Sequence, residues 1–186
     1  LIAVIGIIVA AVTMIKKAPT PSTPVSGAFS DTSFKYSVNI PAEGWRKANT
    51  PSFNSPNISA EFFKGSGRPY NVRLIILYET LDIDISEVPE YALPMIEPAF
   101  IKSAEKIVAR EGYKYEHIKL KIYPEAKTQA LWLEGNARKG SESVRTFIFL
   151  FYKEGHAYDL WFSFKEADTQ KYWPEIKSII DSFTME

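Results

Sequence analysis

The stretch VRTFIFLFYKEGHAYDLWFSF, residues 144–164, decides the fold of this chain. Residues 144–152 are almost continuously apolar, and residues 157–164 form a second run of the same kind. Between the two runs, Glu154-Gly155 is a dipeptide typical of a tight turn. Two such runs joined by a short turn predict a buried antiparallel hairpin.

Two strand-like runs precede this hairpin. Residues 115–123 alternate between apolar and polar side chains, and residues 129–138 lead into a second turn at Gly140-Ser141. Strands that are joined by short turns lie side by side in a sheet. The second half of the chain is therefore predicted to be a four-stranded antiparallel meander.

Three earlier strands are expected in the first half of the chain. Residues 34–40 alternate between apolar and polar side chains, which predicts one buried and one solvated face. Residues 58–63 form a second strand, and residues 65–69 are a hairpin-like connection. Residues 72–81 are apolar on both faces in their middle, so this strand is expected near the centre of the sheet.

Two helices are predicted to pack against the sheet. The prolines at 89, 94 and 98 permit only short turns or a kinked helix before Pro98, so a regular helix is expected from Pro98 to a cap at Gly112. Asp168 opens the second helix, in which Pro174 implies either a kink or a start near Trp173. Two helices on a long antiparallel sheet give an α+β layered domain. The buried stripe of the first helix is Phe100, Ala104, Ile107 and Val108, and that of the second is Tyr172, Ile176, Ile179, Ile180 and Phe183.

The chain begins with an apolar segment. Residues 1–15 contain only two non-apolar members, Gly6 and Thr13, and Lys16 and Lys17 follow. A membrane-spanning helix needs about 20 residues. We therefore interpret residues 1–17 as the C-terminal part of a transmembrane or signal-anchor helix that continues upstream. A cleaved signal peptide is the alternative.

A proline-rich segment separates this helix from the domain. Residues 18–27 read APTPSTPVSG and show no apolar periodicity, so residues 18–28 are expected to be an extended linker. Such spacers hold a folded domain away from a membrane surface. The prediction is a single-pass membrane protein whose globular domain, residues 29–186, lies outside the cytoplasm.

Composition excludes several classes of protein. The 22 Lys and Arg residues balance 22 Asp and Glu residues, and there is no cysteine. Without cysteine there is no disulfide, thiolate zinc site or cysteine nucleophile. Because the chain is neutral overall, phosphate neutralisation does not drive binding, and no nucleic-acid partner is predicted.

No catalytic, cofactor-binding or metal-binding residue is predicted. The chain contains none of the nucleophile or zinc motifs G-x-S-x-G, S-x-x-K and H-E-x-x-H. The only histidines, His117 and His156, lack partners at ligand spacing, so they are expected to be structural or surface residues. Acidic residues gather where the third strand ends, and we interpret them as a solvated acidic rim rather than a Ca²⁺ site. The rim consists of Asp82, Asp84, Glu87 and Glu90.

One aromatic residue is a candidate for partner binding. Trp161 is out of phase with Tyr158, Leu160 and Phe162 on its strand. It lies either beneath a second helix layer or at the surface as an anchor for a protein partner.

Three motifs stand out in the sequence: FKYSVNIPAEGW at residues 34–45, Ala157-Tyr158-x-Leu160, and Tyr172-Trp-Pro-x-Ile176-x-x-Ile179-Ile180-x-Ser182-Phe183. Together they resemble the PsbP-like family, which includes the extrinsic PsbP protein of photosystem II and many bacterial proteins of unknown role. Its fold is shared with a nuclear import factor that binds the Ran GTPase. The resemblance implies a noncatalytic α/β/α sandwich that binds other proteins, and it transfers no catalytic residues. The apolar helix and linker depart from the photosynthetic protein.

Two functions remain open from the sequence. The first is a membrane-anchored, noncatalytic binding or accessory module with a protein partner that the sequence does not identify. The second is a small extracytoplasmic hydrolase or ligand-binding enzyme whose carboxylates assemble only in the fold. A pocket with convergent carboxylates or a histidine favours the enzyme, and a flat aromatic patch favours the module.

Overall fold

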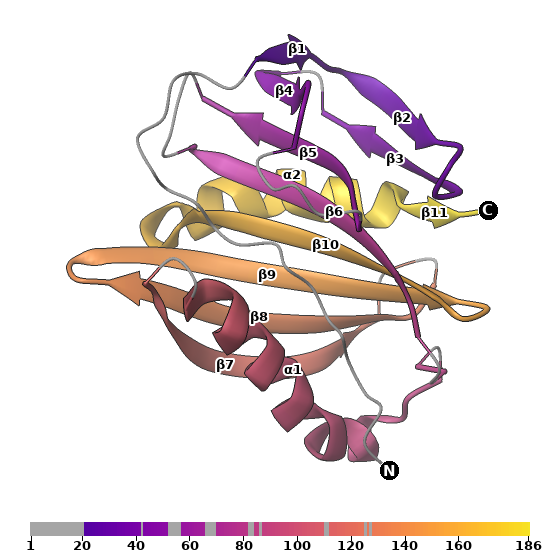
Figure 1. Cartoon of the computed structure of the whole chain (residues 1–186), viewed down its shortest axis with the longest axis vertical. Helices are drawn as coiled ribbons and strands as arrows, with labels where there is room; N and C mark the ends of the chain where they lie inside the picture. The colour runs from indigo at the N-terminus through magenta and orange to yellow at the C-terminus, as the bar shows by residue number, and fades with distance from the viewer. Residues whose placement is uncertain are drawn as a thin grey trace.

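A computed structural model describes residues 21–186, apart from residues 42, 52–56, 66–69, 82–83, 86, 110–111, 125 and 127. Two antiparallel sheets and two longer helices make up the described part of the chain (Figure 1). The predicted membrane helix at residues 1–17 and the first residues of the predicted linker lie outside the described residues.

The main sheet has eight strands, and every neighbouring pair is antiparallel. The strand from residue 72 is buried on both faces along its first six residues and lies fourth in the sheet, so the prediction of a central strand is confirmed. In spatial order the strands are β1 (Ser22–Pro24), β4 (Trp45–Ala48), β5 (Ile58–Lys64), β6 (Val72–Thr80), β10 (His156–Lys165), β9 (Glu142–Lys153), β8 (Ala130–Lys139) and β7 (Lys114–Tyr123).

The predicted meander is present as β7, β8, β9 and β10. At the β9–β10 turn, Glu154 and Gly155 have φ values of 51° and 84°. Positive φ at both turn residues is what the favoured two-residue hairpin turn requires. This turn sets the register, which places Leu160 opposite Phe149.

A second, smaller sheet contains β2 (Gly27–Asp31), β3 (Tyr36–Ile40) and β11 (Thr184–Met185). The structure here differs from the predicted linker, because residues 22–24 and 27–28 belong to strands. These segments pair through their backbone with β4 and β3, and such pairing needs no apolar periodicity in the sequence. The chain thus enters the fold before residue 29.

Both longer helices begin after a short 3₁₀ turn. The first turn is η1 (Glu90–Ala92), and α1 (Leu93–Ala109) therefore begins before the predicted start at Pro98. Pro94 is tolerated there because the first amides of a helix have no partner within the helix. The second turn, η2 (Glu166–Asp168), leads into α2 (Thr169–Ser182), which contains Pro174 rather than starting beside it.

The helices lie on opposite faces of the main sheet and enclose two separate apolar cores (Figure 1). One core lies beneath α2 and β3 and includes Tyr36, Phe149, Phe162 and Ile176. The other lies on the α1 side and includes Val108. This layering confirms the α+β architecture. Among the described residues, no helix has the length and apolar character needed to span a membrane.

Candidate functional site

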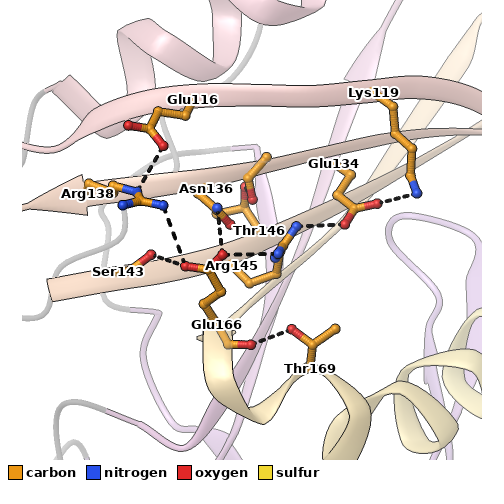
Figure 2. A network of polar contacts seen from close by, with 11 residues as sticks. Glu116, Lys119, Glu134, Asn136, Arg138, Ser143, Arg145, Thr146, Glu166 and Thr169 are labelled. Carbon is orange, nitrogen blue, oxygen red and sulfur yellow. Dashed lines mark hydrogen bonds and ion pairs between the residues drawn. The ribbon is translucent and has the colours of Figure 1, made fainter.

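The carboxylate of Glu166, in the turn that precedes α2, is the centre of a polar network on the main sheet (Figure 2). It accepts hydrogen bonds from Ser143 Oγ at 2.6 Å and from Asn136 Nδ2 at 3.0 Å. The Arg145 Nη2 group donates a third bond at 3.2 Å, and Arg138 Nη2 lies 3.9 Å away. Glu166 therefore ties β8 and β9 to the start of α2.

The network continues across the sheet to the outermost strand, β7. Glu134 on β8 accepts a hydrogen bond from Arg145 Nη1 at 2.8 Å and forms an ion pair with Lys119 Nζ at 2.9 Å. Arg138 Nε pairs with Glu116 Oε2 at 2.9 Å (Figure 2). We call this surface the polar face; it consists of Glu116, Lys119, Glu134, Asn136, Arg138, Ser143, Arg145 and Glu166.

Burial changes along the polar face. The side chains of Arg145 and Glu134 are 15% and 10% exposed, whereas those of Lys119 on β7 and Arg138 near the end of β8 are 46% and 50% exposed. Ion pairs near the surface contribute little to the free energy of folding. The pairs formed by Lys119 and Arg138 can therefore rearrange at little energetic cost. The more buried Arg145–Glu134 pair lies between these exposed pairs and the core of the domain.

The electrostatics of the polar face favour an ionised carboxylate at its centre. The hydrogen bond from Ser143 lowers the pKa of Glu166, and the bond from Asn136 and the Arg145 and Arg138 charges lower it further against the effect of burial. Glu166 is thus ionised at neutral pH and acts as an acceptor. Neither histidine contacts Ser143: His117 Nε2 bonds Glu97 at 2.8 Å, and His156 Nδ1 bonds the Tyr78 hydroxyl at 2.6 Å.

A cavity of about 540 Å³ borders the polar face. Its walls come from the β8–β9 turn, the start of β9 and η2, and include Ser143 and Glu166 themselves. Lys165 and Glu142 are the other charged lining residues. The cavity therefore opens onto the same network of polar side chains.

An aromatic pair adjoins the polar face on its α2 side. Trp132 on β8 and Trp173 on α2 stack with 5.1 Å between ring centroids. Lys121 Nζ lies 4.0 Å from the centroid of the Trp132 ring, and Lys119 Nζ lies 5.2 Å from it. This side of β7 and β8 thus combines cations with an aromatic surface.

Trp161 is the predicted candidate for partner binding, expected either beneath a helix layer or at the surface. The structure places it in the buried position. Its side chain is 1% exposed and packs in the core on the α1 side, on the face opposite the polar face. Because solvent does not reach it, Trp161 is not a surface anchor on the folded domain.

The predicted acidic rim is only partly described. Asp84, Glu87 and Glu90 are exposed, and Asp82 lies outside the described residues. Among the described residues, no group of three or more acidic, histidine or cysteine side chains is arranged to hold a metal ion.

Two carboxylates converge elsewhere, inside the domain. Asp159 on β10 is 1% exposed, and Glu79 lies on the neighbouring β6. They influence each other electrostatically, and burial raises the pKa of Glu79 to about 7. Neither carboxylate lines the cavity beside the polar face.

The polar face is not among the sites predicted from the sequence, although the sequence contains one signal for it. With a two-residue turn at residues 140–141, Lys139 pairs with Glu142, and counting back places Asn136 opposite Arg145. Glu134 then lies diagonal to Arg145 on the same face, within reach of its long side chain. Glu166 was not predictable in this way because it belongs to a turn outside the sheet.

Comparison with known proteins gives a fold but no family. No protein-family model and no curated protein matches the sequence. The solution structure of cyanobacterial PsbP (CyanoP) from Synechocystis has a TM-score of 0.66 and 17% identity, covering 86% of this chain and 91% of that one. The Ran-binding protein Mog1p of Saccharomyces cerevisiae has a TM-score of 0.57 and 12% identity, covering 88% and 96%.

A third solved structure, from Bacteroides thetaiotaomicron, has a TM-score of 0.57 and 8% identity. It aligns with 87% of this chain but only 48% of its own. At these identities the likeness concerns the fold, and it agrees with the resemblance that the sequence motifs indicated. The described part of the chain has the fold of cyanobacterial PsbP and of Mog1p.

Proposed function

We propose that this chain is a membrane-anchored accessory protein whose domain binds another protein outside the cytoplasm through the polar face. The observation that carries the proposal is the gradient along that face. Buried, hydrogen-bonded charges at Glu134 and Arg145 support half-exposed charges at Lys119 and Arg138. A surface whose charges complement those of one partner favours that partner, because other partners bring like charges together.

Two further observations support a binding role. The Trp132–Trp173 pair adjoins the polar face, and aromatic residues are enriched at protein interfaces. Mog1p, which shares the fold, is described as a Ran-binding protein. The apolar run at residues 1–15 and the proline-rich segment after it support the anchor and the extracytoplasmic placement.

The binding role is tested by capture from cells in mild detergent. The full chain and its Arg138→Glu variant are compared, because the substitution breaks contacts with Glu116 and Glu166 at the half-exposed end. We expect the variant to recover a specific partner about tenfold less well, which corresponds to about 1.4 kcal/mol. Lys102→Glu, on the exposed side of α1, is the matched control and is expected to bind like the wild type.

Far-UV circular dichroism of each variant checks that it is folded. If Arg138→Glu is folded and captures the partner as well as Lys102→Glu does, the polar face is not the binding surface. Sidedness is tested separately by adding protease to intact cells. Protection of the domain from external protease contradicts the extracytoplasmic placement.

A further inference from the structure

Among the described residues, the outer edge of β7 is the longer of the two edges of the main sheet and pairs with no other strand. β7 has ten residues and lies last in the sheet, whereas β1 at the other edge has three residues and ends in Pro24. An edge strand presents a row of backbone groups that no neighbouring strand satisfies. Natural proteins keep such edges short or cover them, so a ten-residue edge calls for an explanation.

One outward amide of this edge already holds a carboxylate. Glu97 on α1 accepts a hydrogen bond from the Leu120 backbone N–H at 3.1 Å, and the same oxygen lies 2.8 Å from His117 Nε2. Antiparallel pairing makes the amides of a strand point alternately toward and away from the neighbouring strand. Glu97 thus occupies the position that a carbonyl of a further strand would take.

The side chains of the edge select for acidic partners. The strand β7 itself contains three lysines, Lys114, Lys119 and Lys121, and one carboxylate, Glu116, so its net formal charge is +2. Ile118, at the bulge in β7, is 43% exposed and adds apolar surface. A second copy of this chain would bring the same positive charges to the edge, and like charges facing each other are unfavourable.

We propose that the outer edge of β7 is an interaction surface that takes an extended, acidic segment of a protein partner as an added strand. A backbone carbonyl of the segment replaces Glu97 on the Leu120 N–H, and its carboxylates face Lys114 and Lys121. Strand addition of this kind obtains affinity from main-chain hydrogen bonds and specificity from side chains. The inference rests on the proposed binding function and names the chemistry of the partner.

The test titrates the isotope-labelled full chain in detergent micelles with a synthetic peptide as long as β7 that alternates glutamate and threonine. We expect amide shifts in residues 114–123 and at Glu97, and weaker binding as salt is added. A control peptide with lysine in place of glutamate is expected to leave these resonances unchanged. Absence of shifts in β7 with the acidic peptide, or equal shifts with the lysine peptide, overturns the proposal.

Two variants of the chain test the charge of the edge and the Leu120 amide separately. Combining Lys114→Glu with Lys121→Glu reverses the charge of the edge and is expected to weaken the acidic peptide about tenfold. Glu97→Ala removes the carboxylate that competes for the Leu120 amide, so it is expected to strengthen peptide binding several-fold. Unchanged affinity in both variants contradicts strand addition at this edge.

The two proposals fail in different ways. If a partner captured from cells is lost with Arg138→Glu but kept with the doubly substituted β7 edge, the binding function stands and strand addition is wrong. If no partner is captured but the acidic peptide shifts the β7 amides, the edge is supported while the proposed function fails. Appearance of dimers that bury β7 would identify a second copy as the occupant and overturn the acidic-segment proposal.

Discussion

Two acidic residues lie inside the domain with opposite surroundings. Glu61 is 1% exposed and bonds Arg73 Nε at 2.7 Å. Asp159 is equally buried, but among the described residues neither of its carboxylate oxygens has a hydrogen-bond partner. Burial raises the pKa of Asp159 well above its usual range, and the nearby Glu79 raises it further. Asp159 therefore carries a proton at pH values where an exposed aspartate does not.

The domain is predicted to lose stability as pH rises because of this pair. The folded-state pKa values of Asp159 and Glu79 exceed those of the unfolded chain, so the folded state binds more protons between them. The contribution of this pair to the free energy of unfolding then falls from about pH 4 upward. Asp159→Asn is expected to flatten this dependence and to add about 1–3 kcal/mol at about pH 8, measured by urea unfolding across the pH range.

Glu61→Gln is the matched control for this measurement. It removes a charge from a buried pair and leaves Arg73 without its ionised partner, so it should destabilise the domain rather than stabilise it. A pH dependence that is the same in Asp159→Asn and in the wild type contradicts the assignment.

At the scale of the helices, the two internal prolines are predicted to reduce stability. Pro98 in α1 and Pro174 in α2 each lack the N–H that would bond the residue four positions earlier, and both are exposed. Pro98→Ala and Pro174→Ala are each expected to stabilise the domain by about 1–3 kcal/mol, somewhat offset by greater freedom of the unfolded chain. Thermal unfolding measures the gain; a lower melting temperature in either variant shows that its proline is needed for the helix path.

Arg145 links the turn before α2 to the sheet. This residue bonds both Glu134 and Glu166, which are 10% and 34% exposed. Arg145→Ala leaves two carboxylates near each other without their shared cation and is expected to cost about 2–4 kcal/mol in urea unfolding. Arg138→Ala, at a half-exposed pair, is the control and should cost less than about 1 kcal/mol. Equal losses of stability in the two variants would contradict the prediction that the more buried ion pairs of the polar face contribute more to folding.

The elements that the sequence predicts are those with strong periodicity. Strands β3, β5, β6 and the meander follow from alternation and turn dipeptides, and the stripe of α2 is buried as expected. Short strands such as β1 and β4 have three and four residues, too few for a pattern, and tertiary pairing forms them. The helix α1 begins before Pro98, its predicted start. A proline near the start of a helix is tolerated, because the first amides of a helix have no partner within it.

The candidate site was less predictable than the fold. Trp161 stood out by its phase on the strand, yet phase alone did not decide between burial beneath α1 and exposure. Arg145 and Glu134 lie within apolar runs, where a charged residue is easily overlooked without the register of the β8–β9 hairpin. Pairing across a hairpin follows from the turn, whereas contacts with Glu166 depend on where η2 packs.

At the scale of the whole molecule, the two cores share one sheet. Strands β6 and β10 bury alternate side chains on both faces, so Phe162 belongs to the core beneath α2 and Trp161 to the core on the α1 side. Because both cores are built on the same strands, loss of one core also weakens the strands on which the other core packs. Small single domains usually unfold in one transition, and a shared central hairpin gives a physical reason to expect it here.

The four tryptophans permit a direct test of this cooperativity. Trp161 reports on the α1-side core, whereas Trp45, Trp132 and Trp173 report on the other core. We predict that a variant retaining only Trp161 and a variant retaining only Trp45, with phenylalanine at the other positions, will each show one urea midpoint by fluorescence and by far-UV circular dichroism. The two midpoints are compared within each variant, because the substitutions change the stability that fluorescence and circular dichroism both report. If Trp161 fluorescence changes at lower urea than the dichroism does, α1 and its core detach first and the domain unfolds in two steps.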